Sequence, residues 1–201
     1  MAGKRTSWLL LFGILVLLAL ALNFISFRAA RSATEVEHTL STARAGETLP
    51  QNMARGSTLY YVVQGEDRLA KVLRGALAAE LEALPAVSAA TDISGMAQEE
   101  RAPLLLVALA PQRLWTPLYG RATVTAQLYF ADDGDAPWPV DEAMVLETSP
   151  AVRASGEFTV VDSTWGLISR PAYSEHLAEA LAQRIATALQ DDVFKNPAVT
   201  Q

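Results

Sequence analysis

His38 and His176 are the only histidines in this chain of 201 residues, and it has no cysteine. The missing cysteine excludes a thiolate nucleophile, a disulfide and a cysteine zinc site. His176 lies close to Ser174, Glu175 and Glu179 in the sequence, so it could act as the base of a dispersed catalytic site. The same neighbours suit an ordinary half-exposed helix histidine, and no Gly-x-Ser-x-Gly motif accompanies them. We therefore predict no catalytic residue and no enzyme.

Carboxylates gather on one turn, Asp132-Asp133-Gly134-Asp135. Oxygen ligands of this type bind Ca²⁺ or Mg²⁺. Asp132, Asp133 and Asp135 are therefore candidate metal ligands, although their spacing differs from that of an EF-hand loop. A solvated turn between two strands explains the same residues. No cofactor is predicted.

Phosphate-binding devices are absent from the sequence. The 11 glycines include no Gly-x-Gly-x-x-Gly pattern, and no lysine follows the glycine spacing of a P-loop. The formal net charge of −6 would repel the phosphates of a nucleic acid. We expect neither a nucleotide nor a nucleic acid as a partner.

Aromatic residues in the expected loops provide the main functional hypothesis. The loops that carry tryptophan could fold back over open sheet ends as small apolar cores. Alternatively, they could form an exposed aromatic patch flanked by arginines, the composition favoured at interaction hot spots. The candidate interaction residues of this second interpretation are Trp115, Tyr119, Trp138, Trp165, Arg113 and Arg170.

An uncharged, strongly apolar segment lies between Arg5 and Arg28. As a helix it would be about 33 Å long at roughly 1.5 Å per residue, enough to cross a hydrocarbon core of about 30 Å. We therefore predict a transmembrane anchor over residues 1–27, with residues 7–27 in the membrane. A signal peptide cleaved after Ala21 is the alternative. The short basic N-terminus and the long acidic body favour a single-pass protein with a cytoplasmic N-terminus and a periplasmic or extracytoplasmic body.

Beyond the apolar segment we expect a polar juxtamembrane spacer over residues 28–56, one folded domain over 57–190 and a flexible tail over 191–201. Apolar residues that recur every three or four positions predict two amphipathic helices. The first runs from Gly65-Glu66-Asp67 to Pro85, and the second covers about 172–190. Apolar runs and alternation predict strands over 58–64, 86–93, 103–110, 121–130, 142–148 and 157–162.

Because strands predominate between two helices, we predict an α+β two-layer sandwich whose helices cover one face of a mainly antiparallel sheet. This order of elements resembles that of small envelope-assembly modules such as the lipopolysaccharide-assembly lipoproteins, whose lipidated cysteine this chain lacks.

The sequence therefore predicts a membrane-anchored, non-catalytic interaction or assembly subunit of the bacterial envelope, whose partners are other envelope or membrane proteins. The alternatives are an exported ligand- or divalent-ion-binding domain and an enzyme with a dispersed site.

Overall fold

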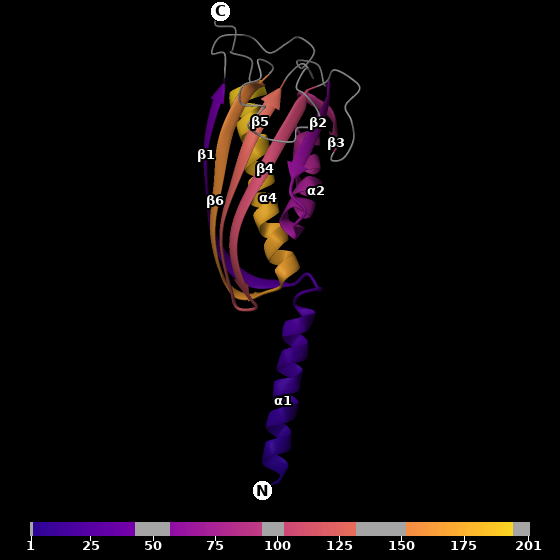
Figure 1. The fold of residues 1–201 in the computed structure, drawn as a ribbon, viewed down its shortest axis with the longest axis vertical. Coiled ribbons are helices and arrows are strands. Elements are labelled where there is room, and N and C mark those ends of the chain that lie inside the picture. The colour runs from indigo at the N-terminus through magenta and orange to yellow at the C-terminus, as the bar shows by residue number, and fades with distance from the viewer. Residues whose placement is uncertain (1, 43–56, 94–102, 132–151, 195–201) are drawn as a thin grey trace, which may run out of the picture.

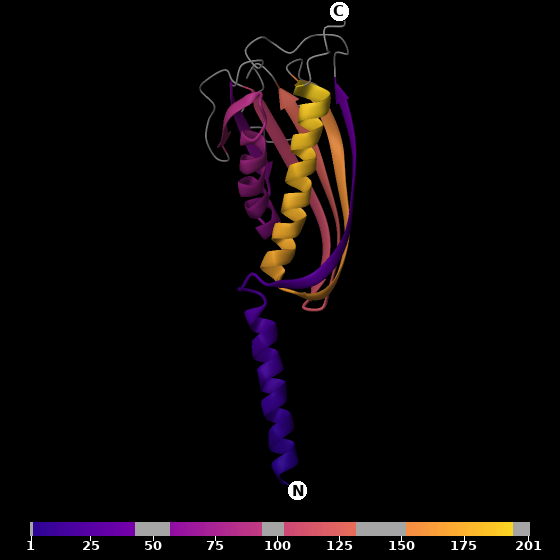
Figure 2. The ribbon, with the colours of Figure 1, turned by 180° about the vertical axis from the view of Figure 1, so that it is seen from behind.

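The computed structural model describes residues 2–42, 57–93, 103–131 and 152–194 (Figure 1). The elements in chain order are α1 (Ala2–Ala21), β1 (Arg28–Thr42), β2 (Ser57–Gln64), α2 (Arg68–Glu82), β3 (Val87–Asp92), β4 (Leu104–Thr116), β5 (Tyr119–Ala131), β6 (Val152–Ile168), α4 (Arg170–Ala188) and the π-helical turns η2 (Leu189–Phe194). The strands form one six-stranded sheet in the order β1-β6-β5-β4-β2-β3. The helices α2 and α4 pack side by side against one face, and the sheet curls around them (Figure 2).

The sheet is mixed. Neighbours from β1 through β6 and β5 to β4 are antiparallel, whereas β4, β2 and β3 are parallel to one another. The helix α2 joins β2 to β3, and a helical crossover is the connection that parallel neighbours require. The predicted α+β sandwich with a mainly antiparallel sheet is therefore wrong. The described chain forms a mixed sheet curled into a half-barrel, together with three helices.

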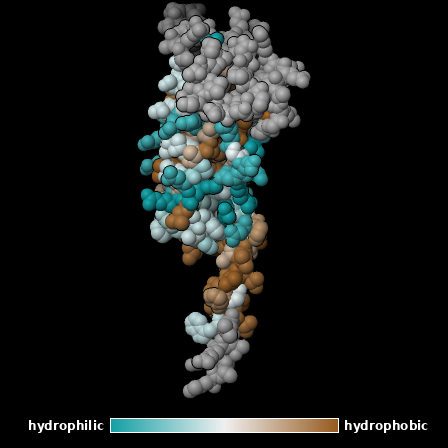
Figure 3. All heavy atoms as spheres, in the orientation of Figure 1, coloured by the Kyte–Doolittle hydropathy of each residue, from teal (hydrophilic) through white to brown (hydrophobic). Residues whose placement is uncertain are grey.

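The helix α1 projects away from the sheet, and its large apolar side chains are exposed (Figure 3). It ends at Ala21 because the next residues turn onto α4, where the Leu22 carbonyl accepts from the Arg170 amide at 2.9 Å. No helix in the described residues combines the length and the apolarity needed to cross a membrane. This finding overturns the transmembrane helix predicted within residues 1–27. It also overturns the single-pass localisation with a cytoplasmic N-terminus and a periplasmic body. The predicted contact of residues 7–27 with a membrane is not tested by this finding and stays a prediction.

Residues 28–42 form the edge strand β1, which pairs with β6 in an unbroken register. The prediction of a spacer over 28–56 is therefore wrong for this part, and residues 43–56 lie outside the described residues. The sequence hid the strand because several of its inward-facing side chains are small or polar, among them Ala30, Ser32 and Thr34. An apolar alternation, the usual signal of a half-buried strand, is therefore missing here.

The strand β4 continues beyond Ala110, where flanking prolines suggested its end. Pro111 pairs with Val124 of β5, but β2 accompanies β4 only as far as Ala108. Beyond that point one side of β4 is an open edge, where the missing N–H of proline removes no ladder hydrogen bond. Trp115 consequently lies in a strand, and so does Trp165, in β6.

Two further predictions concern the last part of the chain. The strand expected over 142–148 lies outside the described residues. The tail expected to be flexible from residue 191 begins with helical turns, in which Val193 and Phe194 are buried. Phe194 packs edge-on against Phe130, with 5.7 Å between the ring centroids. These turns extend α4 along the core rather than leaving it.

The main core lies between the concave face of the sheet and the two packed helices. The helix α2 contributes one stripe of buried leucines, Leu69, Leu73, Leu77 and Leu81. Asp67 caps the start of α2, and Ser169 caps the start of α4 by accepting from the Ala172 amide at 3.2 Å. The Ser169 cap fixes where α4 begins and therefore where the polar residues of α4 meet the sheet.

Candidate functional site

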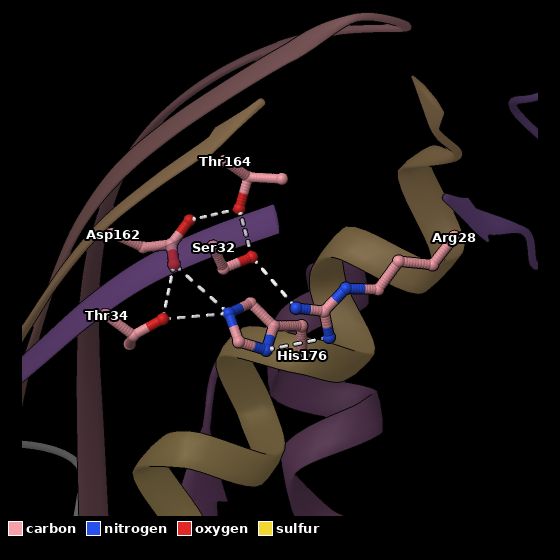
Figure 4. Close-up of polar contacts among 6 residues, drawn as sticks. All are labelled: Arg28, Ser32, Thr34, Asp162, Thr164 and His176. Carbon is pink, nitrogen blue, oxygen red and sulfur yellow. Dashed lines mark hydrogen bonds and ion pairs between the residues drawn. The ribbon is translucent and has the colours of Figure 1, made fainter. Parts of the chain in front are cut away.

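A fully buried carboxylate, Asp162, lies where β1, β6 and α4 meet (Figure 4). It occupies the core-facing side of β6, in phase with Phe158. Thr34 Oγ1 donates to Oδ1 of Asp162 at 2.6 Å, and Thr164 Oγ1 donates to Oδ2 at 2.9 Å. Nε2 of His176 lies 3.1 Å from the same Oδ1. Three elements thus supply the hydrogen bonds that a buried charge requires.

Arg28 closes this network from the opposite side. Its Nη1 lies 3.2 Å from Nδ1 of His176, and its Nη2 donates to Oγ of Ser32 at 2.9 Å. A guanidinium can only donate, so Nδ1 accepts and the proton of the neutral ring is on Nε2, facing Asp162. Thr164 donates its proton to Asp162, so Ser32 must donate to Thr164 across their 2.6 Å contact. Two chains of donors therefore run from Arg28 to Asp162.

The electrostatics of Asp162 follow from these bonds. Burial alone raises the pKa of Asp162, but the hydrogen bonds from His176, Thr34 and Thr164 together outweigh burial and lower it. Burial and the nearby Asp162 charge raise the pKa of Tyr173 far above its usual range. The carboxylate is therefore the charged centre of the cluster, and the tyrosine beside it is neutral.

The cluster contains the groups of an acid–base site, an imidazole, a carboxylate and hydroxyls. Each of these groups already forms hydrogen bonds within the cluster. In nucleophilic catalysis, an imidazole held by a carboxylate presents its other nitrogen to a hydroxyl. Here the lone pair of Nδ1 of His176 accepts from Arg28, and the hydroxyl protons of Ser32 and Thr164 are directed along the chain toward Asp162. This geometry fastens β1, β6 and α4 to one another.

The sequence singled out His176 but missed Asp162. The available signal was phase: Phe158, Val160, Asp162 and Thr164 alternate along one face of β6, so a carboxylate occupies a core position. Such a residue needs partners, but the sequence does not show that β1 would provide them.

The second histidine repeats the pattern farther along β1. Arg184 Nη2 lies 3.0 Å from Nδ1 of His38, and Nε2 of His38 lies 3.6 Å from Oδ2 of Asp192. The imidazole also stacks on Phe158, with 5.3 Å between ring centroids and 21° between ring planes. His176 thus joins α4 to β1, and His38 joins β1 to α4 and to the following turns η2.

Exposed apolar side chains gather at the β4–β5 hairpin and the adjoining part of β6. Trp165 and Tyr119 are cross-strand neighbours with ring centroids 4.4 Å apart. The exposed fractions are 57% for Leu114, 65% for Leu118, 44% for Val161 and 65% for Trp165. We call these residues the tryptophan patch: Leu114, Leu118, Tyr119, Val161 and Trp165. Arg31 pairs across from Trp165 and Arg121 across from Leu114, and both arginines are exposed.

Three predicted interaction residues lie elsewhere. Trp115 faces the core, and its Nε1 donates to the Ile168 carbonyl at 3.2 Å. Arg113 forms an ion pair with Asp67 at the start of α2. Arg170 is exposed at the start of α4, on the concave side. Of the predicted interaction residues that the structure describes, it brings only Tyr119 and Trp165 together.

The remaining predicted site residues, Trp138, Asp132, Asp133 and Asp135, lie outside the described residues. Within the described ranges, no group of three histidine or acidic side chains is arranged to hold a metal ion. The metal site on the aspartate turn stays a prediction.

No protein-family profile matches the chain. No curated protein matches it. Among solved structures, it is similar to the PelC dodecamer from Paraburkholderia phytofirmans, with 17% identity and a TM-score of 0.43 over 79% of this chain and 98% of that one. A single-substitution variant of the same dodecamer gives 18% identity and a TM-score of 0.44 with the same coverage. These identities and TM-scores are too low to indicate the function of this chain.

Proposed function

We propose that this chain is a non-catalytic assembly subunit that binds another protein through the tryptophan patch. The observation that carries the proposal is the exposure of Leu118 and Trp165, each 65% exposed. Leu118 lies in the β4–β5 turn, and its carbonyl accepts from the amide of Gly166, the neighbour of Trp165, at 3.1 Å, so both side chains are at the same end of the sheet. Large apolar side chains that are exposed together at one end of a sheet are typical of interaction sites.

The composition of the patch supports a protein partner. Tryptophan, tyrosine and arginine are the residues enriched at the energetic centres of interfaces. Here Trp165 and Tyr119 form the centre, and Arg31 and Arg121 flank it. Burying one large apolar side chain stabilises a complex by about 1.5–3 kcal/mol before ordering costs.

The patch is also formed before binding. Its residues lie on β4, β5 and β6 and, for Leu118, in the two-residue turn between β4 and β5, and these strands pair in continuous register at this end of the sheet. A surface already held by strand pairing loses little conformational entropy on association. The partner surface that fits it presents an apolar side chain at its centre and carboxylates at its rim, opposite Arg31 and Arg121.

The test is photocrosslinking in cells that make this protein. A benzoylphenylalanine placed at Leu118 should give one discrete adduct with a second protein, identified by mass spectrometry. The same probe at Lys71, an exposed position on α2, serves as the matched control. Trp165→Ala should remove the adduct at Leu118 while leaving the thermal unfolding midpoint nearly unchanged.

Equal adducts from Leu118 and Lys71, or none from either, would overturn the proposal. An adduct with a second copy of this chain would retain the assembly role and identify the partner as the chain itself.

A further inference from the structure

The free edge of β1 is a second surface, distinct from the tryptophan patch. In the described part of the chain, β1 pairs with β6 on one side and ends the sheet on the other. In an antiparallel pair, alternate residues direct both their N–H and C=O groups away from the partner strand. Such an edge can accept an additional strand through its main chain.

A groove of about 530 Å³ lies on this edge. We call it the edge groove, and it is lined by Val36, Glu37, His38, Thr39, Glu157, Thr159 and Arg184. Four of these residues are consecutive in β1, and consecutive strand residues point to opposite faces. A hollow that touches all four therefore reaches around the backbone of β1, including its edge, and it extends over the neighbouring β6 to Glu157 and Thr159, which pair with Thr39 and Glu37.

Several of the usual protections of an edge strand are absent from β1, whereas charged side chains are present. Natural edges are blunted by charged side chains, especially lysine, and by proline, β-bulges or short length. β1 extends over 15 residues, contains neither proline nor lysine, and pairs with β6 without a register shift. Acidic side chains are the charges that its solvent face presents near the groove.

The charge on the groove selects the strand that fits it. Glu37 and Glu157 lie on its outer side, both exposed, and neither forms an ion pair within the described residues. On the inner side, Arg184 already donates to His38, which lies beside Asp192. A second copy of β1 paired around Glu37 would set that carboxylate opposite its own equivalent, which is unfavourable.

From this geometry we propose that the edge groove binds an extended, basic segment of a partner protein, which adds to β1 as a further strand. Its main chain bonds to the free edge at residues 36–39, and its lysine or arginine side chains lie over Glu37 and Glu157. Main-chain bonds supply the affinity, and alternate side chains supply the selectivity.

The test uses the full chain and an alternating Lys-Val heptapeptide with blocked ends. The peptide should slow hydrogen exchange of the β1 amides around residues 36–39. Replacing Glu37→Gln and Glu157→Gln together should weaken binding about fivefold, because two exposed charge contacts are lost. Glu66→Gln with Glu82→Gln, two exposed acids outside the groove, should leave the affinity unchanged.

Two control peptides separate strand addition from simple charge attraction. A backbone N-methylated Lys-Val peptide keeps its charge but cannot form the ladder, so it should give no protection of β1. A Glu-Val peptide should not bind. The proposal is overturned if the N-methylated peptide binds as well as the parent, if protection falls outside β1, or if the Lys-Val peptide does not bind. Trp165→Ala should leave this binding intact, so failure here is independent of failure at the tryptophan patch.

Discussion

Arg28 donates to Nδ1 of His176 across 3.2 Å, and this contact determines which ring nitrogen carries the proton. Arg184 makes the reciprocal contact with Nδ1 of His38 at 3.0 Å. In the first pair the arginine comes from β1 and the histidine from α4, and in the second pair the roles are exchanged. The edge strand is thus held to the helix at two points by a contact between an arginine and an imidazole.

We expect the neutral form of both histidines to be the Nε2–H tautomer. Long-range proton–nitrogen correlation spectra distinguish a protonated from an unprotonated ring nitrogen and check this directly. The chain unfolded in urea, where neither arginine contact exists, is the control. Spectra that place the proton of neutral His176 on Nδ1 would contradict the direction of the whole network.

Asp162→Asn should destabilise the fold by about 2–4 kcal/mol. The carboxylate accepts from Thr34, Thr164 and His176, and an amide would present donors to some of these donors, leaving buried groups unpaired. Urea unfolding followed by circular dichroism measures the loss. Asp192→Asn is the matched control, because that side chain is 44% exposed, and it should cost less than about 0.5 kcal/mol.

The lowered pKa of Asp162 predicts a loss of stability in acid. Its pKa in the folded state lies below the ordinary value of 3.8, so the unfolded chain takes up the proton more readily. The contribution is complete above about pH 5, declines below the ordinary pKa and is lost as the pH falls through the folded-state pKa. Unfolding free energies measured between pH 7 and pH 2.5 should show this decline. A variant carrying Asp162→Asn should show a shallower decline, and an equal slope would refute the assignment to this carboxylate.

Gly120→Ala should destabilise the protein by about 1–3 kcal/mol through overpacking. A Cβ at Gly120 would lie 2.7 Å from a ring carbon of Tyr173, which is buried against β5. Gly75→Ala is the matched control, since its added Cβ meets nothing within 4 Å in the middle of α2. It should stabilise the protein by about 0.5–1 kcal/mol, because alanine is the better helix former. Thermal unfolding of the two variants should therefore shift in opposite directions.

Trp115 and Trp165, the two tryptophans in the described part of the sheet, should differ in how much stability is lost when each is replaced by alanine. Trp115→Ala should cost about 2–4 kcal/mol because the indole packs on the core and its Nε1 donates to the Ile168 carbonyl. Trp165→Ala should cost less than about 1 kcal/mol, since only its contact with Tyr119 is lost from an exposed side chain. Equal losses in chemical unfolding would show that Trp165 is structural rather than available to a partner.

Periodicity predicted the elements that have one apolar face. The leucine stripe of α2 and the alternation of β5 were both readable, because burial on a single side leaves a regular pattern. The strand β1 left no such pattern, because Ser32 and Thr34 face a polar cluster instead of a hydrocarbon core. The extension of β4 through Pro111 depended on where β2 stops pairing, which is a property of the sheet and not of the local sequence.

The candidate sites were only partly predictable for the same reason. Trp165 and Tyr119 could be named, but their contact arises from the β5–β6 register. Trp115 pairs with Gly120 across the same hairpin and points to the face opposite Tyr119 and Trp165, because β4 continues through it. The predicted transmembrane anchor counted apolar residues as far as Phe27, whereas the helix ends at Ala21 and the following turn is bonded to α4.

That turn determines how a mechanical load on α1 would enter the body. The Leu22 carbonyl accepts from the Arg170 amide, the Phe27 carbonyl accepts from the Ser169 amide, and the Phe27 amide donates to Oγ of Ser169. Tension along α1 therefore reaches the first turn of α4 before it reaches the β1–β6 ladder. These three hydrogen bonds would therefore have to break before a pull on α1 acted directly on the pairing of the edge strand with β6.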